Sequence, residues 1–73
     1  MTKISIKKRS KMLSNLKKVR ILQGKTQDDI MIETGIEQGL ISRFENNYRK
    51  PTKDQKKKLA RALKASEKEL FPE

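Results

Sequence analysis

The chain has 73 residues, and its 19 Lys and Arg outnumber its 9 Asp and Glu, so the formal net charge is +10. A chain of this length forms one small domain with a single core and little room for a buried catalytic cleft. It contains no Cys and no His, which removes thiolate metal sites, the commonest general base and the commonest metal ligand, so we expect no enzyme, metal site or cofactor.

Residues 1–9 are basic and show no helical period, so we expect a flexible arm here and a folded domain over residues 10–73. The stretch Met1 to Gln27 contains nine basic residues and no acidic one. So basic a chain favours a polyanionic partner. A solvated surface rich in lysine explains the charge equally well, and basic composition also fits ribosomal proteins and membrane-surface binders.

The first helix is expected to begin at Ser10 or Ser14, either of which can cap it, and to end near Gln23. Gly24 follows, where the end of a helix favours a left-handed residue. The side chains at helical spacing that share one face are Leu13, Leu16, Val19 and Arg20.

Thr26 is expected to cap the second helix, with Asp29 as the acidic partner of a capping box. Gly35 is expected to end this helix in a left-handed turn. Ile30 and Met31 are predicted to face inward, and Ile36 is predicted to fill the corner between the second and third helices.

The third helix is expected over Glu37 to Asn46. Its inner side is predicted to carry Ile41, Phe44 and Glu45. Its outer side is predicted to carry Gln38, Gly39, Ser42, Arg43 and Leu40. Asn47 is expected to cap the end of this helix in the left-handed conformation, and Pro51 prevents a helix through the loop that follows.

Thr52 and Gln55 form a capping box for a fourth helix that ends near Leu63, and Ser66 and Glu69 form a box for a short fifth helix. The apolar residues of these helices are Leu59, Ala62, Leu63, Leu70 and Phe71. No segment alternates with the period of a strand. The sequence therefore predicts an all-α, compact five-helix domain, in which the second and third helices form a helix-turn-helix.

Over Leu13 to Phe71 the chain resembles the Cro/CI-type helix-turn-helix family, also called XRE or lambda-repressor-like DNA-binding domains. The residues that carry the resemblance are Arg20, Thr26, Gln27, Ile30, Gly35, Ile36, Ile41, Ser42, Glu45, Lys50 and Pro51. The resemblance implies a third helix that enters the major groove of DNA, and a dimer on two half-sites. It also implies a regulator of transcription, in most cases a repressor.

Base contacts are expected from the outer side of the third helix, at Gln38, Gly39, Leu40 and Arg43. The amide of Gln38 can pair with adenine, and the guanidinium of Arg43 can pair with guanine or hold a phosphate. Gly39 permits close approach of the backbone or simply weakens the helix. Leu40 contacts a thymine methyl group or is half-buried.

By resemblance, the amide of Gln27 contacts a DNA phosphate. Further phosphate contacts are expected from Lys17 on the first helix and from the loop residues Asn46, Tyr48, Arg49 and Lys50. The resemblance also implies a buried structural ion pair between Arg20 and Glu45.

Three residues depart from the family pattern: Met31 in place of a small residue, Asn47 in place of Gly, and Glu37 in place of a Ser or Thr cap. A carboxylate at Glu37 would repel phosphate unless it caps the helix or accepts from a cytosine amino group.

The function we expect is that of a sequence-specific regulator of transcription that binds double-stranded DNA, and the resemblance implies that it acts as a repressor. The alternatives are an antitoxin or adaptor that binds a toxin or the transcription machinery, and a small nonspecific nucleic-acid binder. We expect a weak homodimer, strengthened on DNA, with a small apolar contact through an exposed Leu70 or Phe71. No stretch has the length of a membrane span or the pattern of a secretory signal, so we expect cytoplasmic residence in a prokaryote, phage or mobile element.

Overall fold

The computed structural model describes residues 14–72, and these form five helices and no strand. The helices are α2 (Asn15–Leu22), α3 (Gln27–Thr34), α4 (Gln38–Glu45), α5 (Lys53–Leu63) and α6 (Glu67–Leu70). The predicted five-helix, all-α domain is therefore confirmed. The predicted arm, the boundary at residue 10, the alternative cap Ser10 and the apolar Leu13 lie outside the described residues.

Local hydrogen bonds set where four of the helices begin. The hydroxyl groups of Ser14, Thr26, Thr52 and Ser66 each accept from the backbone N–H three residues later. At α3, α5 and α6 the third residue also accepts from the N-cap backbone, so that all three predicted capping boxes are present. Such caps satisfy N–H groups that a helix otherwise leaves without partners.

Left-handed residues end or follow the helices where the sequence predicted them, at Gly24 (φ 69°), Gly35 (φ 79°) and Asn47 (φ 61°). Lys64, which ends α5 with φ 51°, was not predicted. Its backbone N–H is bonded to the carbonyl of Arg61 at 3.3 Å, and this closure holds a conformation that a residue with a Cβ ordinarily avoids.

Because its acidic partner is a carboxylate, the capping box of α3 makes the stability of the domain depend on pH in the acid range. The backbone N–H of Thr26 donates to the Asp29 carboxylate at 2.9 Å. This bond, with the Thr26 hydroxyl, holds the pKa of Asp29 below its ordinary value of 3.8. Because the folded pKa is the lower one, the stabilisation is complete above the unfolded pKa and is lost as pH falls through the folded pKa.

We therefore expect Asp29→Asn to lower the thermal midpoint at neutral pH, because asparagine keeps an acceptor but not the charge. The difference from the parent protein should disappear as the pH falls below 3.8 and the carboxylate is protonated. Thermal unfolding followed by circular dichroism between pH 7 and about pH 2.5 checks this. A difference that persists unchanged at the acid end would show that charge is not the cause.

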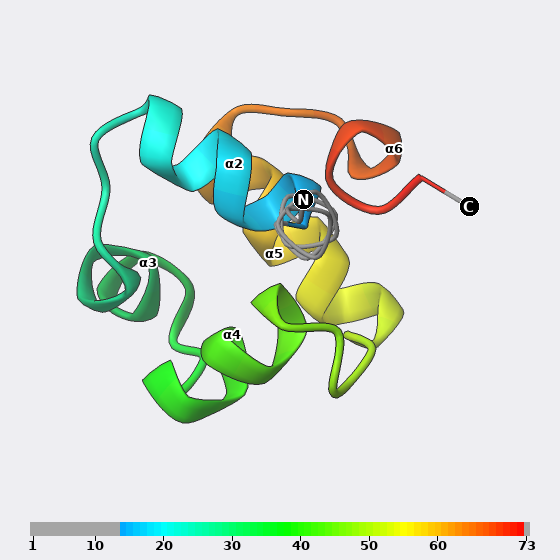
Figure 1. Ribbon diagram of the computed structural model, residues 1–73, viewed down its shortest axis with the longest axis horizontal. Helices are drawn as coiled ribbons and strands as arrows, with labels where there is room; N and C mark the ends of the chain where they lie inside the picture. The colour runs from blue at the N-terminus through cyan, green and yellow to red at the C-terminus, as the bar shows by residue number, and fades with distance from the viewer. Residues whose placement is uncertain (1–13, 73) are drawn as a thin grey trace, which may run out of the picture.

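One core joins the helices. Its buried members are Leu16, Ile30, Ile36, Ile41, Phe44, Leu59, Leu63 and Leu70. Helix α3 packs against α4 and α5, α2 packs against α4 and α6, and α5 packs against α6. In Figure 1, α2 and α6 lie along the upper side of the molecule and α4 along the lower side. This core holds the second and third predicted helices in a fixed relative position.

The expectation for an exposed Leu70 was wrong. Leu70 is only 2 % exposed and belongs to the core, because α6 turns this side chain inward between α2 and α5. Phe71 is half-buried, and the amino group of Lys56 lies 5.7 Å from the centre of its ring. Any apolar contact at this end of the domain is therefore left to Phe71.

Candidate nucleic-acid interface

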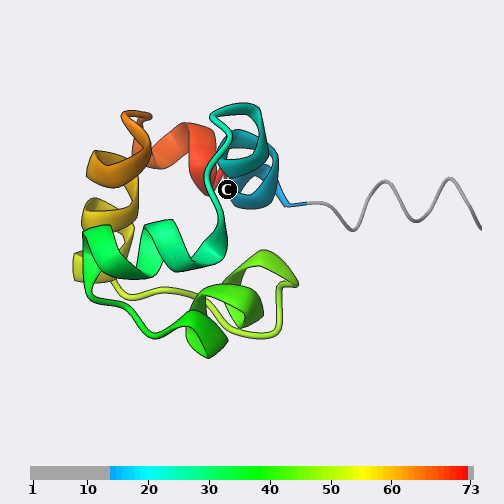
Figure 2. The ribbon, with the colours of Figure 1, turned by 90° about the vertical axis from the view of Figure 1, so that its left-hand side faces the viewer.

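Helix α4 buries one face and exposes the other. Ile41, Phe44 and Glu45 are buried, as predicted. Gln38, Gly39 and Arg43 are exposed on the outer side. Helix α4 and the loop after it lie at the lower edge of the molecule in two perpendicular views (Figures 1 and 2). The polar side of α4 is therefore open to a partner.

Leu40 is half-buried and packs against the core. The sequence predicted that Leu40 either contacts a thymine methyl group or is half-buried, and in the free protein it is half-buried. A contact between Leu40 and a thymine methyl group stays a prediction.

A buried ion pair lies under the inner face of α4. Nε of Arg20 donates to Oε2 of Glu45 at 2.6 Å, and Nη2 donates to Oε1 at 3.1 Å. Nη1 of Arg20 donates to the backbone carbonyl of Lys25 at 2.8 Å. Arg20 and Glu45 are only 9 % and 1 % exposed. The pair thus fastens α4 to α2 and to the loop that leads into α3.

Two glutamines link this buried ion pair to the surface by hydrogen bonds. Nε2 of Gln27 donates to Oε1 of Glu45 at 2.9 Å, and Nε2 of Gln38 donates to Oε1 of Gln27 at 3.3 Å. These bonds fix which way the Gln27 amide faces. Gln38 keeps a carbonyl oxygen and one N–H for a further partner, which is the pair of groups that adenine requires.

This chain of hydrogen bonds was not predicted. Gln27 was expected to contact a phosphate and Gln38 a base, without a link between the two side chains. The two residues are 11 positions apart, and only the packing of α3 on α4 brings them together. One N–H of Gln27 remains beyond its bond to Glu45, and the phosphate contact stays a prediction.

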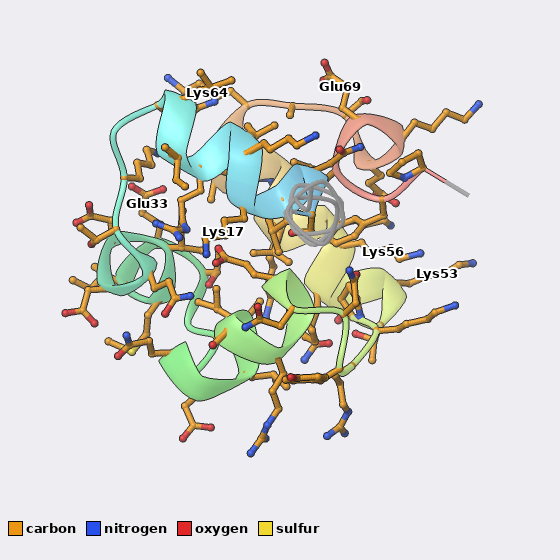
Figure 3. The ribbon with its side chains drawn as sticks, viewed as in Figure 1. Lys17, Glu33, Lys53, Lys56, Lys64 and Glu69 are labelled. Atoms are coloured by element: carbon orange, nitrogen blue, oxygen red, sulfur yellow. The ribbon has the colours of Figure 1, made fainter. Side chains whose placement is uncertain are left out.

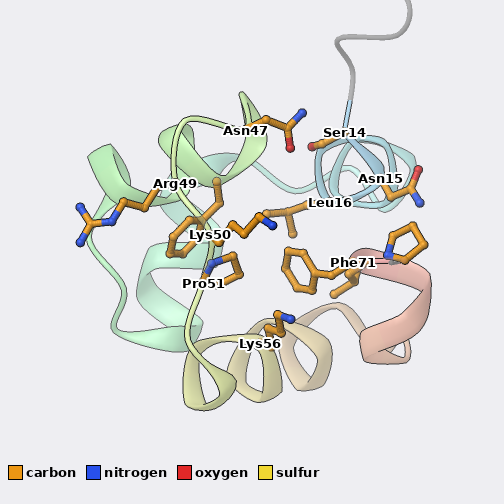
Figure 4. Close-up of a pocket in the computed structure, with 12 residues that line it drawn as sticks. Ser14, Asn15, Leu16, Asn47, Arg49, Lys50, Pro51, Lys56 and Phe71 are labelled. Atoms are coloured by element: carbon orange, nitrogen blue, oxygen red, sulfur yellow. The ribbon is translucent and has the colours of Figure 1, made fainter.

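The loop after α4 presents its side chains in different directions. Tyr48 is 80 % exposed. Figure 4 shows Arg49 turned away from a nearby cavity and Lys50 turned into it. Nδ2 of Asn46 donates to the carbonyl of Ser42 at 2.9 Å, so this side chain covers the end of α4. Arg49 and Tyr48 are thus the loop side chains most accessible to a phosphate backbone.

The cavity has a volume of about 280 Å³ and lies between the start of α2, the loop after α4, and the last residues of the domain. Leu16, Phe44 and Phe71 line its apolar part, and Lys50 and Lys56 line its charged part. Lys50 is exposed, and its side chain turns toward this cavity, whereas the side chain of Arg49 turns away from it. A phosphate contact from either residue stays a prediction.

Lys17, the remaining predicted phosphate ligand, is half-buried near the start of α2, and Figure 3 shows its place among the side chains. The labelled side chains of Lys53, Lys64 and Glu69 point outward on other sides of the molecule. The positive charge of the described residues is therefore not confined to the α4 side.

Gly39 is not required by packing within the free protein. A Cβ at this position would meet no atom within 4 Å, and Gly39 does not have a positive φ. Glycine destabilises a helix relative to alanine. Packing within the described residues therefore gives no reason for a glycine at this position.

We expect Gly39→Ala to stabilise the free protein by about 0.5–1 kcal/mol. If the backbone of α4 approaches the bases closely, the same change should weaken DNA binding. Chemical unfolding and a binding titration with one protein preparation measure both effects. Improved stability with unchanged affinity would mean that the glycine has no part in the interface.

Within residues 14–72, no group of three or more His, Cys, Asp or Glu is placed to hold a metal ion. In the same part of the chain, no helix is long and apolar enough to cross a membrane.

A comparison with protein families matched residues 16–70 to the family described as helix-turn-helix. The match begins one residue inside α2 and extends to the end of α6, so it includes the paired α3 and α4. No curated protein and no solved structure matched the chain.

Proposed function

The chain belongs to the helix-turn-helix family of the Cro/CI (XRE) type, and we propose that it is a sequence-specific repressor that inserts α4 into the major groove of double-stranded DNA. The family is one of DNA-binding transcription regulators. Repression would follow from occupation of a promoter. Cytoplasmic residence in a prokaryote, phage or mobile element is part of the same prediction.

The observation that carries the proposal is the two-sided character of α4. Its buried side is fastened by the Arg20–Glu45 pair, and its other side presents Gln38 and Arg43 to solvent. Side chains of these types pair with adenine and guanine edges in the major groove. In this proposal Gln38, Gly39, Leu40 and Arg43 face the bases.

The phosphate contacts in this proposal come from residues near both ends of α4. Gln27 lies at the start of α3, where backbone N–H groups also favour an anion. On the other side stand Asn46, Tyr48, Arg49 and Lys50, and Lys17 on α2 is a further candidate. Such contacts position the protein, whereas base contacts give specificity.

We also propose that the protein forms a weak homodimer which DNA strengthens. Burial of Leu70 removes one of the two apolar side chains expected for the contact, and this favours a small interface. A protein partner, either a toxin or the transcription machinery, is the alternative role. Leu22 on α2 and Ile32 on α3 are 83 % and 76 % exposed, and such a partner could use these apolar side chains.

The test is selection from a pool of randomised duplexes at physiological salt, followed by sequencing of the bound fraction. A dimeric regulator should enrich inverted half-sites with centres about one helical turn apart. A single enriched half-site would show a monomeric reader. Binding that enriches nothing and vanishes steeply as salt rises would contradict the proposal, since only the phosphate-driven attraction would remain.

A further inference from the structure

Glu37 stands at the beginning of α4 with an unused carboxylate. Its backbone carbonyl accepts from the N–H groups of Leu40 and Ile41, both at 3.0 Å, so the residue is held as the N-cap. Its side chain is exposed and makes no capping hydrogen bond. Within residues 14–72 it has no salt bridge either. Within the described residues the carboxylate therefore has no bonded partner, and only its attraction to the N-terminus of α4 favours it there.

The place of Glu37 matters if α4 is the helix that reads DNA, and the inference rests on that proposed function. Residues at the N-terminal end of a recognition helix reach the base edges. Glu37 directly precedes Gln38, whose amide is assigned to an adenine. Its carboxylate would then lie in the major groove, close to the phosphates of both strands.

A carboxylate in the groove is repelled by phosphates unless a donor compensates it. The amino groups of cytosine and adenine are the donors that base edges offer in the major groove. Adenine presents its N7 acceptor beside that amino group, and N7 repels a carboxylate. Guanine offers two acceptors, and thymine offers an acceptor and a methyl group. Cytosine is therefore the base that compensates the charge best.

We propose that Glu37 is a specificity-determining residue that accepts a hydrogen bond from the amino group of a cytosine next to the adenine read by Gln38. The carboxylate acts in two ways. It favours operators that carry this cytosine, and it weakens binding to other sequences, where its charge finds no donor.

The experiment compares the parent protein with Glu37→Gln in the duplex selection. Glutamine has the same length but carries a donor as well as an acceptor, so it suits adenine rather than cytosine. Glu67→Gln is the matched control. It removes the same charge from an exposed position on α6, a helix that packs on α2 and α5. Selection with Gln38→Ala identifies the neighbouring adenine, because that position should lose its preference.

We expect the parent operator to contain the cytosine, and the Glu37→Gln operator to show adenine or no preference at that one position. On the parent operator, Glu37→Gln should bind about tenfold more weakly, and on random duplexes it should bind more tightly. Glu67→Gln should select the parent operator. Because the Glu37 side chain has no bonded partner in the described residues, losing its charge should remove only the attraction to the N-terminus of α4 and lower the thermal midpoint by a few degrees at most.

The inference is overturned if the parent operator lacks a cytosine beside the adenine, or if Glu37→Gln selects the same operator as the parent. Either result would leave the proposed function standing, because an operator would still have been selected. If the parent protein enriches no sequence at all, the proposed function and the inference both fall.

Discussion

Replacing Glu45 with alanine should destabilise the domain by about 3–5 kcal/mol, because it leaves the Arg20 guanidinium buried without its counter-charge. Arg20 is 9 % exposed, and it gives two of its hydrogen bonds to Glu45. Its remaining bond, to the carbonyl of Lys25 at 2.8 Å, does not neutralise the charge. Small domains are stable by about 5–15 kcal/mol, so this loss removes a large fraction of the total.

Urea unfolding followed by circular dichroism measures the loss. Glu33→Ala is the matched control, since Glu33 forms a more exposed ion pair with Lys25 at 3.0 Å. Exposed pairs contribute about 0–1 kcal/mol. Replacing both buried partners, as in Arg20→Met with Glu45→Leu, should recover much of the stability. If Glu45→Ala lowers the free energy of unfolding no more than Glu33→Ala does, a buried uncompensated charge is not what makes Glu45 important for stability.

Gln38→Ala should weaken binding to the selected operator by about 1–3 kcal/mol and relax the preference at one base position. The reason is geometric. The bond from Nε2 of Gln38 to Oε1 of Gln27, at 3.3 Å, holds the amide before DNA arrives. The carbonyl oxygen and the second N–H can then engage one adenine without further ordering of the side chain.

A titration on the selected operator and on random duplex DNA separates this role from general attraction. Arg49→Ala is the contrast, because Arg49 is exposed and turned outward from the loop. Loss of a phosphate contact should weaken binding to both duplexes alike and reduce the salt slope by about 1. Equal losses on both duplexes for Gln38→Ala would refute its role as a base reader.

The sequence alone determined the five helices and the capping of four of them. Ser14, Thr26, Thr52 and Ser66 bond to N–H groups three residues away, and Gly35 takes the left-handed turn that glycine adopts readily. These interactions lie within a few residues of each other, so a local pattern contains them. The joint spacing of such signals also identified the family, which the match over residues 16–70 confirms.

Only the tertiary structure decided which side chains meet. It turned Leu70 into the core and linked Gln38 through Gln27 to the buried Glu45. It also left the carboxylate of Glu37 without a partner in the described part of the chain. These outcomes depend on how the helices pack, α6 on α2 and α5 for Leu70 and α3 on α4 for the glutamines, because residues far apart in sequence meet only when the helices are assembled. Local sequence propensity does not specify that packing, whereas the properties of the candidate DNA-reading face arise from the packing.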